Sequence, residues 1–327
     1  MEKIDIKDRK ILYQLDLNCR QSNTQIGKKV GLSKQVVDYR IKRMEEKGII
    51  IGFWTEINSF KLGYYVFRIY IRFIDVSTKI KAEIIQYFVK NPDAWAVLTS
   101  KGPVDLDVIL WVKDIYTVNQ YWINTLQKFG KYFSQSNISI LTRAISCKKS
   151  FLLDSSVTSS DRGFHIMSCE GDLVPIDKFD YRILNELALN ARTSLLDLAK
   201  KIDCSPQTIN YRIKHLMKKE IILAFRVNIH SAKLGLQGYA VDLYLRDQMM
   251  RRQILNYIKQ NPNIYDIMDM NIGWCDIAFQ ILLSSINELS ILMEDIETKF
   301  PDAIRKYEYW IDQIIHKERW LPEMEFK

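Results

Sequence analysis

Two near copies of one segment hold the residues best suited to chemistry. Residues 33–49 read SKQVVDYRIKRMEEKGI, and residues 205–221 read SPQTINYRIKHLMKKEI. Each begins with a Ser whose hydroxyl is suited to capping the first turn of a helix. Apolar residues then recur at the spacing of a helix that lies on a core. The opposite face is polar, and its side chains are of the kinds that bind base edges and phosphates: Gln35, Asp38, Tyr39 and Lys42, and Gln207, Asn210, Tyr211 and Lys214.

Composition favours an anionic partner without specifying one. The 327-residue chain has a net charge of +8 and a pI near 9.0. The sequence has no apolar run long enough for a membrane span and no signal peptide at its start, so we expect a cytoplasmic protein. Its five cysteines form no CxxC pair and its four histidines show no ligand spacing, which predicts reduced thiols and no metal site.

The elements around the first polar segment predict a winged helix-turn-helix. Residues 5–17 and 23–30 show helical periodicity, Gly31 allows a tight turn, and Ser33 opens the third helix. The β-branched residues 49–51 then suggest the hairpin of a wing. A small helical packing domain is the alternative, and the exposed basic face counts against it.

From Tyr65 onward the pattern changes to strand and helix in the order βαββαβ, which predicts a ferredoxin-like antiparallel sheet covered by helices. Residues 150–172 lose this periodicity and read as a linker or mobile crossover. The predicted fold class is α+β. We expect helix-turn-helix modules at residues 1–63 and 173–236, ferredoxin-like domains at 64–149 and 237–327, and the linker at 150–172.

The second half of the chain repeats the first at an offset of 172 residues. Asp5, Asp8, Ile11, Leu12 and Leu15 match Asp177, Asp180, Ile183, Leu184 and Leu187. Such agreement over a whole module indicates a tandem duplication. Farther along, the alignment pairs Tyr70 with Tyr244, Arg72 with Arg246, Gly102 with Gly273 and Asp105 with Asp276.

With these motifs in this order, the chain resembles the leucine-responsive regulatory protein/AsnC family, whose members join a winged helix-turn-helix to a βαββαβ ligand-sensing domain. The family opening D..D..IL..L..N.R, the S......RI helix and the G..D turn each occur twice. Members are usually built from homodimers, so the chain resembles a dimer fused into one polypeptide. The resemblance leaves open further homo-oligomers and pairing of sheets between chains.

The resemblance implies that each polar helix enters a major groove of double-stranded DNA, at half-sites roughly 34 Å apart. Arg40 and Arg212 adjoin the apolar stripe, so we expect them to pack inward or hold the backbone. The implied DNA-binding residues are Ser33, Lys34, Gln35, Asp38, Tyr39, Lys42 and Arg43 in the first copy and Ser205, Gln207, Asn210, Tyr211, Lys214 and His215 in the second. Lys28, Lys29, Lys200 and Lys201 are further phosphate candidates.

The two polar helices are not identical, which suggests that the DNA site is an imperfect palindrome. Asp38 corresponds to Asn210; a carboxylate accepts from cytosine, whereas Asn pairs with adenine. The second module also has Asp203 and Cys204 for Gly31 and Leu32, and Glu220 for Gly48. These departures predict weaker DNA binding by the second module.

The resemblance also implies an amino-acid-like effector at the turns that contain Gly102, Asp105, Gly273 and Asp276, and no other cofactor. An Asp beside a Gly turn is more often a structural turn former, and both readings stay open. Pro103 and Trp274 make the two turns unlike each other.

Three other functions are alternatives to a local regulator. A nonspecific, chromatin-like DNA binder needs the same basic faces but little base discrimination. A protein-interaction module would not explain the retained Gln, Tyr and Lys faces. The sirohaem decarboxylases share the architecture, but their His-containing strand motif is missing from residues 94–102 and 264–273. The sequence therefore predicts no catalytic residues and no enzyme.

Overall fold

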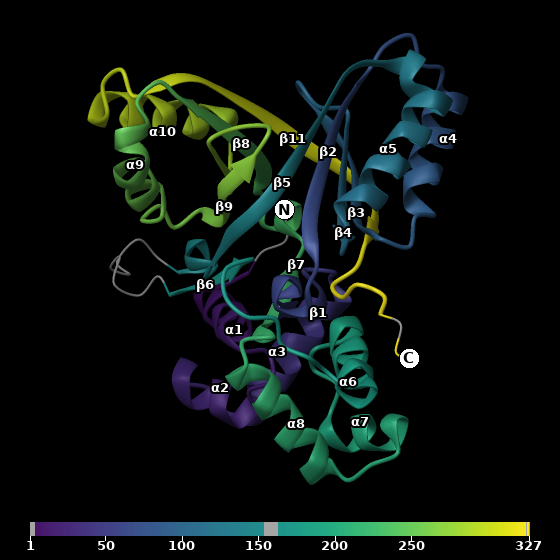
Figure 1. Cartoon of the computed structure of the whole chain (residues 1–327). Coiled ribbons are helices and arrows are strands. Elements are labelled where there is room, and N and C mark those ends of the chain that lie inside the picture. Colours follow the sequence, from purple (N-terminus) through teal and green to yellow (C-terminus); the bar gives the residue numbers. More distant parts are fainter. Residues whose placement is uncertain (1–3, 154–162, 325, 327) are drawn as a thin grey trace.

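The computed structural model describes residues 4–153, 163–324 and Phe326, apart from the side chains at positions 270, 271, 312 and 313. One order of elements occurs twice along the chain, which confirms the predicted two-copy α+β fold. In Figure 1 the helices α1–α3 and α6–α8 gather at one end of the molecule, and two separate lobes form the other end. The duplication therefore places both helical modules together rather than at opposite ends.

The first helical module has the capped helices that its sequence predicts. Ser22 and Ser33 each accept a hydrogen bond from the backbone amide three residues on, and Gly31 adopts the left-handed conformation between the two helices (φ 68°). The elements are α1 (Ile6–Leu17), α2 (Asn23–Val30), α3 (Lys34–Glu46) and β1 (Ile50–Ile57).

The second module keeps this geometry although its turn residues differ. Asp203 and Glu220 have φ values of 61° and 56°, close to the 68° and 63° of Gly31 and Gly48. A residue with a Cβ atom adopts this conformation at a cost of about 1–2 kcal/mol. The substitutions thus change the backbone energy and not the path of the chain. The elements are α6 (Lys178–Leu189), α7 (Leu195–Ile202), α8 (Pro206–Lys218) and β7 (Ile222–Ile229).

The wing differs from the prediction. We expected a hairpin within each module, but β1 pairs with β7 in one two-stranded antiparallel sheet, so each module contributes a single strand. A lone strand would leave its backbone N–H and C=O groups unpaired, and the other module supplies the partners. The two helical modules are consequently joined by a shared sheet, and a single apolar cluster runs through both.

The ferredoxin-like order βαββαβ is confirmed in both halves. In each half the helices cover one face of an antiparallel sheet and enclose an apolar core. The first domain consists of β2 (Tyr65–Phe73), α4 (Thr78–Val89), β3 (Ala94–Lys101), β4 (Leu106–Val112), α5 (Ile115–Phe129) and β5 (Phe133–Cys147). The second consists of β8 (Gln237–Leu245), α9 (Arg251–Ile258), β9 (Ile264–Ile272), β10 (Ile277–Leu283), α10 (Ile286–Lys299) and β11 (Ile304–Glu318).

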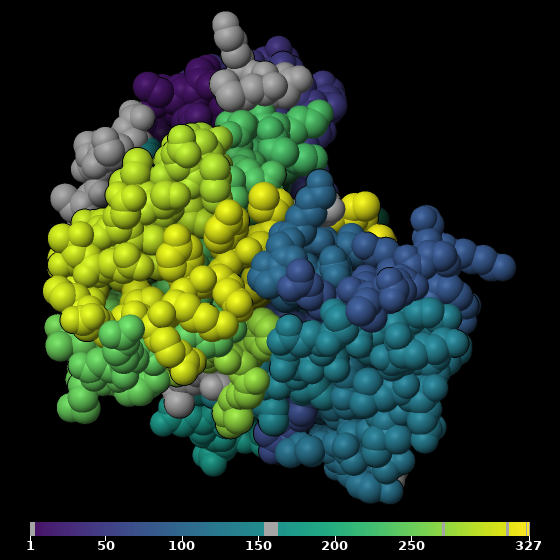
Figure 2. All heavy atoms as spheres, turned by 90° about the horizontal axis from the view of Figure 1, so that it is seen from above, coloured from purple at the N-terminus to yellow at the C-terminus, as the bar shows by residue number. Residues whose placement is uncertain are grey.

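The two sheets join each other within the chain. Strand β3 pairs with β11 and β9 pairs with β5, so the strands form a closed ring in the order β2-β4-β3-β11-β8-β10-β9-β5. Seen from above in Figure 2, the two domains lie side by side along a continuous border. The long strands β5 and β11 each pair with both sheets, which makes them the principal links between the halves.

Part of the expected linker is structured. Strand β6 (Phe164–Ser168) pairs with β5 at residues Arg143–Cys147, and residues Ser150–Leu152 form a 3-10 helix against α1. The prediction of a mobile crossover is wrong for Phe164–Ser168, whose backbone groups pair with the end of β5 that extends beyond β2. Residues 154–162 lie outside the described part of the chain.

The structure also corrects the alignment of the two ferredoxin-like domains. The Phe73 amide donates to Asp105 Oδ2 (2.8 Å), and the Leu245 amide donates to Asp276 Oδ2 (2.7 Å), so Phe73 and Leu245 are equivalent. The 172-residue offset therefore continues through β2 and β8. Tyr70 therefore corresponds to Asp242. The predicted matches of Tyr70 with Tyr244 and of Arg72 with Arg246 were wrong by two positions, because they were chosen for identical residue types and not for the strand register.

Candidate DNA interface

The polar face of α3 is open to solvent. Ser33 accepts a hydrogen bond from the Val36 amide at 3.3 Å, which fixes the start of the helix, while Val37 is fully buried beneath it. Tyr39 is 64% exposed, so its ring and hydroxyl project from the surface. The other exposed members of this face are Lys34, Gln35 and Lys42. Apart from half-buried Asp38 and Arg43, the predicted DNA-binding residues of the first module are therefore accessible.

Asp38 is held in place by two neighbours. Asn23 Nδ2 donates to Asp38 Oδ1 (3.1 Å), and Lys42 Nζ lies 3.0 Å from Asp38 Oδ2. The half-buried carboxylate is thus oriented by α2 and by the next turn of α3. Pairing with Lys42 also offsets the repulsion between Asp38 and DNA phosphates.

The polar face of α8 has the same arrangement with different side chains. Ser205 caps the helix by accepting from the Thr208 amide (3.1 Å), and Tyr211 is 67% exposed. His215 stacks on the Tyr211 ring with their centroids 6.4 Å apart. Gln207 and Lys214 are exposed and Asn210 is half-buried, as Asp38 is in α3.

The arginines beside the apolar stripe fix each reading helix to the start of its module. Arg40 Nη1 lies 2.7 Å from Asp5 and 2.8 Å from Asp8, and Arg212 Nη1 lies 2.6 Å from Asp177 and 3.1 Å from Asp180. Asp5 and Asp8 cap α1 and Asp177 caps α6, so the expectation that Arg40 and Arg212 do not read bases agrees with their positions.

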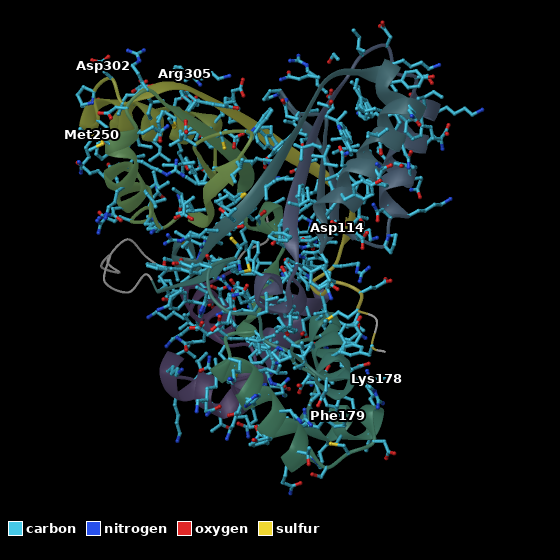
Figure 3. The ribbon with its side chains drawn as sticks, viewed as in Figure 1. Asp114, Lys178, Phe179, Met250, Asp302 and Arg305 are labelled. Carbon is cyan, nitrogen blue, oxygen red and sulfur yellow. The ribbon has the colours of Figure 1, made fainter. Side chains whose placement is uncertain are left out.

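Two neighbours complete these ion-pair clusters. Figure 3 shows Phe179 at the start of α6, and the Arg212 guanidinium lies 5.3 Å from the centre of its ring. Arg43 Nη2 lies 2.6 Å from Asp8, which is buried, so Arg43 belongs to the Asp8 cluster as well as to the surface. Its contact with phosphate stays a prediction.

Sequence reasoning missed the residues that join the two modules. Arg20 Nη1 donates to the carbonyls of Ala191 and Thr193, each at 2.7 Å, and Arg192 Nη2 donates to Asn23 Oδ1 (3.1 Å). Both arginines belong to the N.R part of the repeated opening motif. The sequence shows that the two arginines are repeated. Their hydrogen-bond acceptors lie in the opposite module, and only the tertiary structure brings that module close. These hydrogen bonds help to hold the modules that carry α3 and α8 in a fixed relative position.

The predicted effector turns have structural partners. Asp105 accepts from the Phe73 amide, while Asp276 accepts from the Leu245 amide and from Gln248 Nε2 (2.7 Å). These bonds are those of turn formers, the alternative that the sequence left open. Glycine is required at both turns, because a Cβ atom on Gly102 would lie 2.9 Å from Trp310 Cβ, and one on Gly273 would lie 2.6 Å from the Ile138 carbonyl oxygen.

Replacing Gly102 or Gly273 by Ala is expected to lower the free energy of unfolding by about 1–3 kcal/mol in each case. Both residues have positive φ (135° and 99°), and both touch a long strand of the opposite half. Urea unfolding measures the change. Gly238→Ala is the matched control, because its added methyl group meets only Leu282 at 3.7 Å. Equal stabilities of the three variants would contradict this reading of the turns.

A buried carboxyl group lies where the two ferredoxin-like domains meet. Asp242 is 1% exposed and accepts a hydrogen bond from Trp274 Nε1. Burial raises the pKa of Asp242 to about 7, against the opposing effects of Trp274, Arg68 and Cys275; Glu308 raises it further. Because the native state holds this proton more tightly than the unfolded chain does, stability present in acid is lost as the pH rises from about 4 to about 7 and changes no further above that.

We expect Asp242→Asn to remove this part of the pH dependence, since the amide oxygen still accepts from Trp274. Between about pH 4 and pH 7 the parent protein should lose about 1.4 kcal/mol per pH unit relative to the variant, and above about pH 7 the difference should level off. Urea unfolding across roughly pH 4–8.5 gives the difference between the two proteins, in which all other titrating groups cancel. Parallel stability curves would show that Asp242 is ionised throughout.

Comparisons with known proteins agree with this geometry. The winged helix-turn-helix DNA-binding family model matches residues 4–51 and 176–222, one match in each half. The transcriptional regulator LrpA of Pyrococcus horikoshii is 32% identical over 111 residues, which cover 77% of that protein and 34% of this chain. A helix-turn-helix regulator of Methanocaldococcus jannaschii is 35% identical over 122 residues, covering 78% of that protein and 37% of this chain. This chain is a DNA-binding helix-turn-helix transcriptional regulator. It belongs to the Lrp/AsnC family, with two copies of the family unit in one polypeptide.

The crystal structure of the siroheme decarboxylase NirDL aligns with 98% of this chain and 94% of its own, with a TM-score of 0.63 and 12% identity. At this identity the likeness shows the fold alone. Within the described residues no three His, Cys, Asp or Glu side chains form a group that could hold a metal ion. The helices in that same part of the chain are all too short or too polar to cross a membrane.

Proposed function

We propose that the chain is a cytoplasmic regulator that reads two half-sites of double-stranded DNA in successive major grooves, with α3 in one groove and α8 in the next. The observation that carries the proposal is the pair of capped, exposed reading faces held by one shared sheet and by the Arg20 and Arg192 bridges. A fixed spacing between two readers is what half-site recognition requires. The single chain supplies both readers, so no second copy is needed for this step.

Fluorescence anisotropy tests the proposal. Binding to the DNA upstream of the gene for this chain is compared with binding to a scrambled duplex of equal length at several salt concentrations. A preference of about a thousandfold that survives moderate salt supports sequence-specific recognition. Equal affinities with a steep salt dependence indicate a nonspecific DNA-coating protein instead.

An effector of the amino-acid kind, bound near Asp105 or Asp276, is also a proposal. Because both carboxylates already accept from backbone amides, an amino group would have to replace one of these bonds. Thermal-shift measurements with each of the common amino acids, on the parent protein and on Asp105→Asn, test it. A shift that the variant retains would place the effector elsewhere.

The likeness to the decarboxylase extends to the fold alone and does not support a catalytic activity. The space between the two sheets holds a stack of Tyr70 on Trp274 (centroids 4.5 Å apart) and the edge of Trp310. A haem-like absorbance in the purified protein would reopen this reading.

A further inference from the structure

The pseudo-two-fold axis of the molecule passes between two residues of opposite character. Trp54 on β1 and Arg226 on β7 are direct partners in the shared sheet, and they are also equivalent positions of the duplication, 172 residues apart. In a symmetric dimer of identical halves, one residue type would face itself at this point. Here an aromatic ring and a guanidinium meet instead.

Arg226 enters a buried cluster of charges that belong to the first half, defined as residues 1–153. Its Nη2 lies 2.8 Å from Asp16 Oδ2 and donates to the Cys147 carbonyl at 2.7 Å, and its Nη1 donates to Ser146. Lys149 Nζ lies 2.8 Å from Asp16 Oδ1. Burial raises the pKa of Asp16, but Arg226 and Lys149 outweigh it and hold that pKa below its ordinary value. Asp16 is therefore a buried charge that depends on both halves.

The equivalent place in the second half, residues 163–327, lacks the Asp16–Lys149 ion pair. Ala188 on α6 stands where the first half has Asp16, and Trp320 stands where it has Lys149. Trp320 stacks on Trp54 with the ring centroids 4.1 Å apart. Beside this stack is a cavity of ≈ 300 Å³, whose lining includes Ala188, both Trp rings and Asn228, with Glu318 and Arg319 at the same cavity. An aromatic stack thus fills one side of the junction where a buried ion pair fills the other.

A third difference between the two halves lies in the ring of strands. Trp310 on β11 is 1% exposed and packs on Gly102 and Tyr70 of the first half. Its counterpart on β5 is Ser139, beside Gly273. The second half supplies the large ring of Trp310, and the first half supplies the small side chain of Ser139. The side-chain volumes at the two equivalent places are therefore complementary only when unlike halves pair.

Pairing of like halves would violate each of these matches. Two first halves would set Trp54 against Trp54, remove Arg226 from Asp16, and leave Ser139 in the space that Trp310 fills. Two second halves would bury Arg226 against Arg226 with Ala188 and Asn228 in place of Asp16 and Glu56. Two buried like charges that face each other are among the costliest arrangements in a protein interface.

We infer that this junction is a heterotypic pairing surface, by which each half accepts the unlike half and rejects a copy of itself. The only partner that fits is therefore the other half, from the same chain or from a second copy of this chain. Any assembly through this surface presents one Asp38 reader beside one Asn210 reader. The inference concerns assembly and does not rest on the proposed function.

The test begins with the full chain, which carries a protease site inserted between Leu153 and Gly163. The folded protein is cut, unfolded in urea and refolded by dilution, and native mass spectrometry counts the pairs of fragments. Unlike pairs should exceed like pairs by about tenfold or more, against roughly equal numbers for random reassembly. Roughly equal numbers would overturn the inference.

A substituted protein shows whether the axis residues cause the selection. Arg226→Trp gives both halves the same axis residue, so the excess of unlike pairs should fall several-fold, whereas Arg246→Trp, at a 60% exposed position, should leave it unchanged. Equal excess in the two variants would also overturn the inference.

If the fragments do not refold, a measurement on the intact chain tests whether charge at the axis determines the pairing. Trp54→Arg reproduces the Arg–Arg contact of two second halves, while Trp54→Leu removes the same aromatic stack without adding charge. The urea midpoint should fall about twice as far for Trp54→Arg as for Trp54→Leu. Equal shifts would mean that charge at the axis does not determine pairing.

Discussion

Replacing Arg226 by Met is expected to lower the free energy of unfolding by about 3–5 kcal/mol. The guanidinium is 4% exposed and pairs with Asp16 and Glu56, whose side chains are 0% and 2% exposed. Met keeps much of the volume but removes the charge, so Asp16 keeps only Lys149 and Glu56 loses the cation beside it. A buried charge that loses its partner costs more than the pair contributed, which is why the effect is large.

Urea unfolding with the parent protein measures this effect, and Arg246→Met is its control. Arg246 lies 3.5 Å from Asp302, but the two side chains are 60% and 90% exposed, so its loss should cost less than about 1 kcal/mol. Figure 3 shows Asp302 at the outer end of the second ferredoxin-like domain, far from the shared sheet. Similar losses for the two variants would mean that the Asp16 cluster is solvated.

Exchanging the two unlike reading residues, Asp38→Asn together with Asn210→Asp, is expected to reverse the order of the preferred half-sites. Each side chain occupies the equivalent half-buried position on its helix, and each bidentate or charge-matched base contact is worth about 1–3 kcal/mol of discrimination. The exchange should therefore shift relative affinity by about 5–150-fold per half-site. This prediction rests on the proposal that α3 and α8 read bases.

Selection of binding sites from a random duplex library, followed by anisotropy on the selected sequences, gives the result. Glu46→Gln is a suitable control, because Glu46 is exposed at the last residue of α3, away from Asp38. An unchanged motif in the exchanged protein would show that Asp38 and Asn210 do not contribute to specificity. Loss of all DNA binding would instead question the reading helices themselves.

Much of the local structure was predictable because local rules decide it. Ser22, Ser33 and Ser205 begin helices where their hydroxyl groups satisfy free backbone amides, and the apolar stripe through Val37 and Ile209 determines which face is buried. The βαββαβ order followed from the change of period after Tyr65. The exposed reading faces of α3 and α8 were predictable for the same reason, as the sides opposite those stripes.

The contacts between the halves were not predictable from these rules. The wing was expected as a hairpin, but β1 found its partner in β7, because hydrogen bonding along a strand does not depend on which segment supplies the neighbour. The equivalence of positions in β2 and β8 likewise follows from the hydrogen bonds of Asp105 and Asp276, and not from the identity of Tyr70 and Tyr244.

By itself, then, the sequence determined the duplication, the order of elements, the capped helices and the two unlike reading faces, all of which depend on residues close together in the chain. Only the tertiary structure decided that β3 joins β11 and that Arg226 meets Asp16 across 210 residues. Such pairings depend on charge and volume at positions far apart in sequence, and a pattern of neighbouring residues carries no information about them.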